Sequence, residues 1–330
     1  MKSVTVVLST YNRAKGLAGA LDCAAALTLP ESVEWEILVV DNNSSDSTRA
    51  VVEEFCRRYP RRFRYLFEPQ QGLSHARNAG IRQARGEIIA FMDDDVTVPQ
   101  SWLQNLTAAL HGSEWAGAGG RVVPAQSFSP PRWLPLQDRY ALAPLAMFDL
   151  GPQAGQLFEP PFGANMAFKR EMFEKYGLFR TDLGRSAGSM ISNEDTEFGE
   201  RLLAAGERLR YEPSAVVYHP VLEDRLREKY FLTWWLGKGR SDARQFGIRP
   251  NAQYFYRGIP LYLFRNLAMR TVQWMLAVDP GLRFSHKLKV WRKMGEILEC
   301  YRQAVSTRKG FEPADGIVSS ESLQPAANNH

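Results

Sequence analysis

The chain has 330 residues, of which 45% are hydrophobic and 12% aromatic, so it can bury a large core and carry an appended unit. Its three cysteines, Cys23, Cys56 and Cys300, form no CxxC pair, which argues against a zinc cluster and a disulfide framework and suits a reducing cytoplasm. The apolar run near the N-terminus is too short for the core of a signal peptide, so we expect a cytoplasmic protein.

The formal net charge of +5 conceals an asymmetry along the chain. Residues 1–224 hold 23 Lys and Arg against 28 Asp and Glu, whereas residues 225–309 hold 18 against 5. We therefore predict one domain over 1–224, a basic and aromatic-rich helical region over 225–305, and a disordered tail over 306–330. The basic block suits solvated helix faces, an anionic lipid surface or nucleic acid.

Short apolar runs alternate with helical patterns through the first hundred residues. Strands are predicted at 4–9, 36–40, 63–67 and 87–92, and helices at 17–24, 48–59 and 75–84. This alternation predicts an α/β fold, with a parallel sheet and helices on both faces. Ligands of such sheets bind beyond the carboxyl ends of the strands, so the polar residues at those ends should share one rim. These residues are Thr10, Tyr11, Asn12, Asp41, Asn42, Asn43, Asp93, Asp94 and Asp95.

Three consecutive carboxylates, Asp93, Asp94 and Asp95, follow the last of these runs. Unpaired neighbouring carboxylates raise one another's pKa, so this grouping implies a cation or a set of hydrogen-bond donors. Carboxylate oxygens favour Mn²⁺ or Mg²⁺, whose remaining positions are typically filled by water and substrate phosphates. The glycine fingerprints of dinucleotide and P-loop sites do not occur in the sequence. A diphosphate held through a divalent cation is therefore predicted, and a capped turn is the alternative.

Several segments resemble the nucleotide-sugar half of the family 2 glycosyltransferases, which have the GT-A fold. They are VTVVLSTYNR (4–13), EILVVDNNSSDST (36–48), GLSHARNAGIRQARGEIIAFMDDDV (72–96), FGANMAFKREMFEKYGLF (162–179), NEDTEFGERLLAAG (193–206) and YEPSAVVYHP (211–220). The resemblance covers about the first 220 residues. It implies a mixed, mainly parallel GT-A sheet and a transferase that uses a UDP- or GDP-sugar with inversion, and the C-terminal helices are expected as an appendage.

The resemblance assigns roles at the donor site. Thr10 and Tyr11 match positions that flank the nucleotide base, and Asp41 matches the carboxylate that accepts a hydrogen bond from it. Asn12, the next residue in the same turn, is grouped with them. Arg77 is expected near the base or the diphosphate, and a helix-surface arginine is the alternative.

The same resemblance makes Asp95 the expected metal ligand. Asp93 or Asp94 would meet the ribose or the sugar, and Asp93 is also a candidate metal ligand; the assignment between these two stays open. His219 matches a histidine that approaches the metal or diphosphate in related enzymes, and a hydrogen-bonded structural histidine is the alternative. Asn165 fits a loop residue near the donor sugar and diphosphate, or a turn position chosen for its backbone geometry.

The acidic pair Glu194 and Asp195 precedes a helical pattern and occupies the position of the family's catalytic acids. We predict that Asp195 is the base that takes the proton from the acceptor hydroxyl, with Glu194 as the reserve candidate. Carboxylates in a first helical turn are stabilised as anions, which weakens them as bases, and helix capping alone is the alternative.

The stretches 230–236 and 259–278 are the most apolar of the chain, but Arg265 and Arg270 interrupt the second. These charges argue against a transmembrane span. An amphipathic helix at the inner face of the cytoplasmic membrane fits the charge, and a helical subdomain packed on the sheet fits equally. The expected partners are a nucleotide sugar and a sugar or lipid-linked acceptor, with no nucleic acid.

Two functions follow from these observations. The first is a metal-dependent glycosyltransferase of polysaccharide or glycolipid synthesis. The second is a catalytically inactive nucleotide-sugar-binding or membrane-docking protein of the same fold. The presence of both the aspartate triplet and the later acidic pair favours the enzyme.

Overall fold

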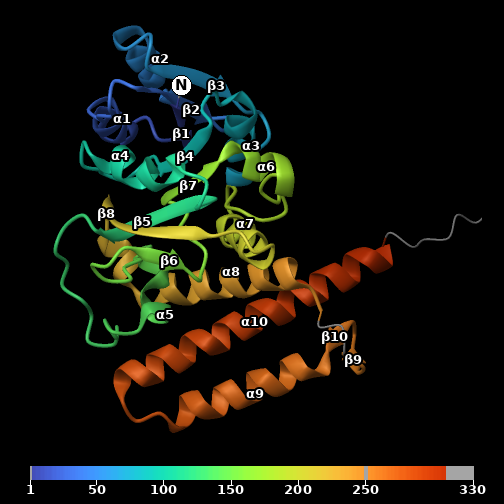
Figure 1. Cartoon of the computed structure of the whole chain (residues 1–330). Helices are drawn as coiled ribbons and strands as arrows, with labels where there is room; N and C mark the ends of the chain where they lie inside the picture. Colours follow the sequence, from blue (N-terminus) through green and yellow to red (C-terminus); the bar gives the residue numbers. More distant parts are fainter. Residues whose placement is uncertain (1, 249–251, 310–330) are drawn as a thin grey trace, which may run out of the picture.

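The computed structural model describes residues 2–248 and 252–309, and an eight-stranded sheet forms its centre (Figure 1). The strands are β1 Lys2–Thr10, β2 Val33–Asp41, β3 Phe63–Phe67, β4 Ile88–Asp93, β5 Gly117–Pro124, β6 Gly155–Leu157, β7 Asn165–Lys169 and β8 Leu209–His219. They lie in the order β3-β2-β1-β4-β7-β5-β8-β6. Strands β3, β2, β1 and β4 are parallel, whereas β7 is antiparallel to β4 and β5, and β6 is antiparallel to β8. The predicted mixed, mainly parallel sheet is confirmed.

Helices surround the sheet and continue beyond it. They are α1 Leu17–Ala25, α2 Thr48–Arg58, α3 Leu73–Gln83, α4 Trp102–Thr107, α5 Arg139–Leu142, α6 Arg170–Tyr176, α7 Glu194–Ala204, α8 Glu228–Phe246, α9 Leu261–Leu276 and α10 Pro280–Lys309. Short 3-10 turns cover Ala108–His111, Ala143–Leu145 and Glu223–Leu226, and a small hairpin pairs β9 Phe255–Tyr256 with β10 Ile259–Pro260.

The first four strands lie where their apolar runs predicted them. β1 and β2 are longer than expected because their pairing continues from Lys2 opposite Val33 to Thr10 opposite Asp41. Backbone hydrogen bonds do not require apolar side chains, so the ladder extends past each run into its polar ends. The centres of both strands are buried on both faces, as expected of parallel strands covered by helices.

The pairing register brings the polar strand ends together. Thr10 lies opposite Asp41, and Ser9 lies opposite Asp93, so three strands end at nearly the same level. This edge is the carboxyl end of the parallel strands, where ligands of open α/β sheets bind. The shared rim predicted from the sequence is therefore formed by β1, β2 and β4.

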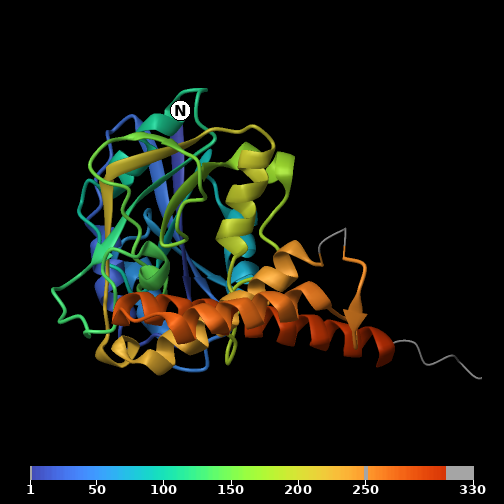
Figure 2. The same cartoon turned by 90° about the horizontal axis from the view of Figure 1, so that it is seen from below.

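The C-terminal helices pack against the sheet domain through a second hydrophobic core. Its buried residues come from both sides of the predicted boundary at residue 224: Leu134, Ala141, Leu142, Leu145, Val221, Phe231, Trp234, Trp235, Phe284 and Leu288. Figures 1 and 2 show α10 running along α8 beneath the sheet domain, and Figure 1 shows α9 farther out. The predicted packed helices are present, although α10 includes residues 306–309 of the predicted tail. The rest of that tail, 310–330, lies outside the described residues.

Glycines allow α8 and α10 to approach closely. A Cβ atom added to Gly239 of α8 would lie 1.8 Å from the carbonyl oxygen of Arg292, and one added to Gly295 of α10 would lie 2.1 Å from that of Leu236. Both obstacles are backbone atoms, which cannot rotate away as a side chain would. The two helices can therefore pack this closely only because both positions are glycine, which has no side chain.

We predict that Gly239→Ala lowers the free energy of unfolding by about 1 to 3 kcal/mol, because the methyl group forces α8 and α10 apart. Gly19→Ala in α1 is the matched control, since a Cβ atom there meets no atom within 4 Å, and it should be neutral or stabilising by up to about 1 kcal/mol. Urea unfolding followed by circular dichroism measures both changes. Equal effects of the two substitutions would contradict the described packing.

Candidate active site

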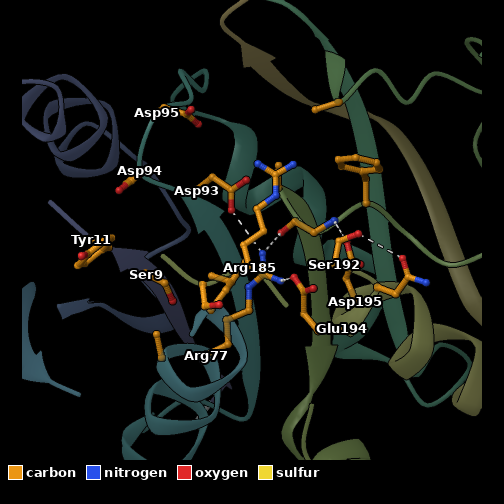
Figure 3. Close-up of a pocket in the computed structure, with 18 of the residues that line it drawn as sticks. Ser9, Tyr11, Arg77, Asp93, Asp94, Asp95, Arg185, Ser192, Glu194 and Asp195 are labelled. Carbon is orange, nitrogen blue, oxygen red and sulfur yellow. Dashed lines mark hydrogen bonds and ion pairs between the residues drawn. The ribbon is translucent and has the colours of Figure 1, made fainter. Parts of the chain in front are cut away.

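A cavity of about 480 Å³ opens at the carboxyl ends of β1 and β4. Nine of the residues predicted from the sequence line it: Thr10, Tyr11, Arg77, Asp93, Asp94, Asp95, Glu194, Asp195 and His219. Figure 3 shows the three aspartates on one side of Arg185 and the acidic pair of α7 on the other. The volume suits a ligand of several rings. Residues more than 100 positions apart thus converge on one chamber.

The three aspartates are held by three donors, and Arg13 faces two of them, because its Nε atom also lies 3.5 Å from Oδ1 of Asp94. Asp93 accepts a hydrogen bond from Arg77 at 3.4 Å, and Asp94 accepts one from the hydroxyl of Thr10 at 2.7 Å. Asp95 pairs with Arg13 at 2.8 Å. Burial raises the pKa of Asp93, and it raises the pKa of Asp94 to about 6 against the lowering effect of the Thr10 hydroxyl. The triplet is therefore a cluster held by separate donors.

A buried ion pair connects the two sides of the cavity. Arg77 of α3 donates to Glu194 at 2.7 Å. Its second amino group donates to Asp93 at 3.4 Å and to the carbonyl oxygen of Gly163 at 3.2 Å. Both side chains of the pair are about 5% exposed or less. Burial and the neighbouring Asp195 raise the pKa of Glu194 to about 7, although Arg77 acts in the opposite direction. Arg77 thus lies inside the site, and the helix-surface alternative is wrong.

Asp195 lies at the start of α7 with its carboxylate in the cavity lining. Its Oδ2 atom accepts a hydrogen bond from the backbone N–H of Gly163 at 2.8 Å, and Oδ1 accepts one from the N–H of Thr196 at 2.7 Å. These contacts fix the direction of the carboxylate, and the lining contains both the aspartates and Asp195. Glu194, in contrast, is 4% exposed and engaged with Arg77.

Asp95 and His219 fit a divalent cation. The Nε2 atom of His219, at the end of β8, lies 3.8 Å from Oδ1 of Asp95, and two ligand atoms about 2.1 Å from one ion are roughly 3 to 4 Å apart. Burial lowers the pKa of His219, so its imidazole is neutral and suited to a metal. Its Nδ1 atom is buried without a hydrogen-bond partner.

This pair does not amount to a complete protein cage. Within residues 2–248 and 252–309, no group of three or more His, Cys, Asp or Glu side chains is arranged to hold a metal ion. Mg²⁺ and Mn²⁺ commonly bind through one or two protein ligands and take their other positions from water and substrate phosphates. A two-ligand site therefore fits such an ion, but Arg13 and, at 3.8 Å, Arg225 now face Asp95.

Three of the residues given a site role, and the rim residue Asn43, lie outside the cavity lining. Asp41 is buried at the end of β2, where it accepts hydrogen bonds from the N–H of Ser44 at 3.0 Å and the hydroxyl of Tyr65 at 2.9 Å. Asn12 has a positive φ of 49° and binds the N–H of Ser45. Both side chains hold turns at the strand ends, and their contact with the donor stays a prediction.

Asn165 lies in a strand, so the loop and turn positions predicted for it are wrong. It is the first residue of β7, is fully buried, and accepts a hydrogen bond from the indole N–H of Trp102 at 2.9 Å. Its amide group donates to the carbonyl oxygens of Arg121 and Ala215. All of its hydrogen-bonding groups are therefore used between strands and α4, and none faces the donor site in this structure.

The cavity contains further residues that the sequence did not single out. Arg13, Arg185 and Arg225 bring cationic groups to the aspartate side. The lining also includes Trp234, Trp235 and Lys238 of α8 and the small residues Ala143, Pro144 and Ala146. The adjacent STYNR motif is a signal that could have identified Arg13. The other two arginines and the α8 residues lie in segments whose sequence has no recognisable site pattern.

The sequence is similar to those of known glycosyltransferases. A family model described as "Glycosyl transferase family 2" matches residues 5–177. The succinoglycan biosynthesis protein ExoM of Rhizobium meliloti is 29% identical over 243 residues, which are 73% of this chain and 73% of that protein. The glucosyl-dolichyl phosphate glucuronosyltransferase of Haloferax volcanii is 26% identical over 240 residues, 71% of this chain and 75% of that protein.

Solved structures show the same fold. The mannosyltransferase PcManGT from Pyrobaculum calidifontis, in complex with GDP-Man and Mn²⁺, superposes with a TM-score of 0.55 at 20% identity. The superposition covers 93% of this chain and 75% of that one. The predicted GT-A arrangement, with helices appended at the C-terminus, is thereby confirmed.

The raised pKa of Glu194 predicts a pH dependence of stability. The folded state binds this proton more tightly than the unfolded state, whose pKa is near 4.5. The stabilising contribution is therefore complete below about pH 4.5 and is lost as the pH rises through about 7. Over that range, wild type should lose up to about 3 kcal/mol of unfolding free energy relative to Glu194→Gln, measured by urea unfolding at several pH values.

Glu299→Gln is a control with the opposite sign. Burial acts to raise the pKa of Glu299, but hydrogen bonds from Arg244 and Arg240 outweigh it and lower the pKa. Wild type should therefore gain stability relative to Glu299→Gln as the pH rises from acid towards about 4.5. A stability difference between wild type and Glu194→Gln that does not vary with pH would show that the described burial of Glu194 is wrong.

Proposed function

Since the chain belongs to glycosyl transferase family 2 and is a glycosyltransferase, we propose that it moves a sugar from a UDP- or GDP-sugar to an acceptor hydroxyl group. The observation that carries this proposal is the single cavity lined by both the strand-end aspartates and Asp195. A donor diphosphate at the aspartates and an acceptor hydroxyl at Asp195 would then meet in one chamber. A family member that only bound nucleotide sugars would not need the second group.

The donor half of the cavity supports binding of a nucleoside diphosphate. Thr10 is the last residue of β1 and Tyr11 follows it. Both would contact the nucleoside, and Tyr11 is 40% exposed and available to a base. Arg13, Arg185 and Arg225 would face the phosphates, whose charge suits guanidinium groups. Asp41 would hold the turn after β2, and Asn12 would join that turn, through Ser45, to the one that carries Tyr11.

Mn²⁺ or Mg²⁺ would be held by Asp95 and His219, with Asp93 nearby. When bound, the ion supplies positive charge that stabilises the departing diphosphate. Arg13 occupies Oδ2 of Asp95, which leaves Oδ1, the oxygen that faces His219, for the ion. Arg13 would then lie beside both the ion and the phosphates.

Asp195 is the proposed base. As the acceptor oxygen bonds to the anomeric carbon, the bond from that carbon to the diphosphate oxygen breaks, and the hydroxyl proton passes to the Asp195 carboxylate. This single displacement inverts the anomeric configuration. Glu194 is the weaker candidate because its carboxylate is buried and paired with Arg77. The ion pair between Glu194 and Arg77 would instead hold Asp195 in a fixed position relative to the aspartates.

The acceptor would approach from the wall formed by α8 and residues 143–146, across Asp195 from the donor. We propose a sugar acceptor, carried by a lipid or a growing polysaccharide at the inner face of the cytoplasmic membrane. Two relatives support this class by name, one in succinoglycan biosynthesis and one acting on a glucosyl-dolichyl phosphate.

The outer face of α9 supports contact with a membrane surface. Its exposed side is formed mainly by apolar residues at helical spacing: Leu261, Ala268, Met269, Val272, Met275 and Leu276. Of the residues of α9, all of which the structure describes, only Leu263 is buried. No helix within the described ranges is long and apolar enough to cross a bilayer. Lipid with an anionic surface is the proposed partner, because Arg265 lies on this face and the surrounding region is strongly basic.

We predict that Asp195→Asn lowers sugar transfer, or slow donor hydrolysis, by about 10²- to 10⁴-fold, because the amide cannot accept the proton. Donors are first found by screening UDP- and GDP-sugars by thermal shift with Mn²⁺, since ligands that bind the folded state raise its midpoint. The variant should keep the same nucleotide-dependent shift. Nucleotide release by the purified protein gives the rate.

Asp95→Asn separates metal binding from proton transfer. This variant should lose the Mn²⁺-dependent part of the nucleotide thermal shift, whereas Asp195→Asn should retain it. Unchanged transfer by Asp195→Asn would eliminate that residue as the base. Binding of nucleotide sugars by wild type without transfer or hydrolysis would instead favour the alternative function, an inactive binding protein.

The membrane contact is tested by co-sedimentation with vesicles of phosphatidylcholine and phosphatidylglycerol in equal parts. Wild type should sediment with these vesicles, less with pure phosphatidylcholine, and less at high salt because exposed charges are screened. Replacing Met275 and Leu276 together by glutamate should abolish binding. Phe158→Glu, at an 84% exposed apolar residue of the sheet domain, is the control and should bind as wild type does. Equal sedimentation of both variants would refute the role of α9.

A further inference from the structure

Asn193, the residue before the acidic pair, has an unusual backbone conformation. Its φ is 82° and its ψ is 9°, in the left-handed region that residues other than glycine seldom occupy. It is the N-cap of α7, is 2% exposed, and is followed directly by Glu194 and Asp195. A conformation of this kind persists only where surrounding contacts hold it. The direction in which the two acids leave the turn therefore depends on whatever fixes Asn193.

The contacts that fix Asn193 come from one face of α8. Its side-chain oxygen accepts a hydrogen bond from Lys238 at 2.7 Å. Its amide nitrogen donates to Asp242 at 3.0 Å and to Gln245 at 2.8 Å. These three positions are four and three residues apart, so they form a single stripe on the helix. The amide of Asn193 is thus held by three side chains of α8.

Neighbouring contacts bind the same turn to the same helix. The N–H of Ser192 donates to the hydroxyl of Ser241 at 2.9 Å. A Cβ atom added to Gly237 would lie 2.7 Å from the carbonyl oxygen of Met190, so α8 approaches the chain closely before the turn. Asp242 also accepts a hydrogen bond from Arg292 of α10 at 2.5 Å. A connected series of polar contacts therefore runs from α10 through α8 to the acidic pair.

We propose that Asp242 and Lys238 are positioning residues of the transferase, which hold Asn193 in its left-handed conformation and thereby direct Asp195 at the reacting atoms. This inference rests on the proposed function, because it assumes that Asp195 is the base. It gives the C-terminal helices a role beyond membrane contact or acceptor access. They complete the catalytic site, although they lie outside the segment 5–177 that matches the family.

The turn before α7 must place two adjacent side chains at once. Asp195 accepts a hydrogen bond from the N–H of Gly163, and Glu194 pairs with Arg77, so the backbone has to direct each side chain to its own partner. Relaxation of Asn193 to a negative φ would rotate α7's first turn and break at least one of them. A displacement of about 1 Å at a reacting group can lower a rate by roughly 100-fold.

The experiment compares Asp242→Ala with Glu299→Ala. Both carboxylates are buried, both bridge α8 and α10, and each pairs with two basic residues, but Glu299 binds Arg240 and Arg244 and makes no contact with Asn193. Asp242→Ala should lower kcat for donor hydrolysis by about 10- to 100-fold with an unchanged donor KM. Glu299→Ala should lose comparable thermal stability yet keep kcat. Equal loss of kcat in both variants would reduce the network to ordinary helix packing and overturn the proposal.

Asn193→Gly provides a second variant that is expected to fold, since glycine readily adopts the positive φ. It removes the three side-chain bonds and should also lower kcat without changing the donor KM. Hydrogen–deuterium exchange gives a readout that does not require activity. Residues 190–197 should lose protection in Asp242→Ala and Asn193→Gly but not in Glu299→Ala.

The outcomes separate the two hypotheses. Unchanged protection and unchanged kcat in both Asp242→Ala and Asn193→Gly would refute the positioning role while leaving the transferase assignment intact. If Asp195→Asn is fully active, the proposed base is wrong, and with it the catalytic part of this inference. The exchange data would then still test whether α8 holds the turn.

Discussion

The site depends on the ion pairs that the buried guanidinium group of Arg77 makes with acids on both sides of the cavity. It lies between Asp93 at the end of β4 and Glu194 at the start of α7, and it also donates to the carbonyl oxygen of Gly163. The buried Glu194 carboxylate would carry a large desolvation cost without this cation, because breaking a buried pair leaves an uncompensated charge, whereas the Asp93 side chain is partly exposed. By pairing with both Asp93 and Glu194, Arg77 allows the strand-end acids and the acidic pair to line the same cavity. The distance between the aspartates and the acidic pair is set by the length of the Arg77 side chain, which contacts both.

The parts of this arrangement that depend on local patterns could be predicted from the sequence. Apolar runs located β1, β2 and β4, and their polar ends located the rim, because parallel strands in register must end together. Asp93 and Thr10 were identified in this way. The roles of Asp41 and Asn165 could not be, because they depend on which distant group each side chain meets. Asn165 bonds to Trp102, 63 residues away, and such a pairing has no sequence period.

The basic C-terminal third illustrates the same limit. Its composition correctly indicates a distinct helical region, but the five acids among its residues 225–309 matter more than their number suggests. Asp242, Glu296 and Glu299 are buried, and each pairs with lysine or arginine inside the helical unit. The pairs of Asp242 and Glu299 use part of the positive charge to join α8 and α10, whereas the pair of Glu296 with Lys293 lies within α10. The remaining cations, among them Arg265 on the outer face of α9, make the surface of the helical region basic.

The helices thus present opposite chemistry on their two sides. α8 faces the cavity with Trp234, Trp235 and Lys238 and holds the turn before the acidic pair, whereas α9 turns an apolar stripe outward. If α9 lies in the headgroup region of a bilayer, α10 connects that layer to α8 through the contact at Gly239 and Gly295. The base is then anchored to the same unit that meets the lipid. A lipid-linked acceptor would be delivered from the membrane to α8, where its hydroxyl group would reach Asp195. The soluble nucleotide sugar would enter at the strand ends. One rigid unit would in this way set both the height of the enzyme above the membrane and the direction of its base.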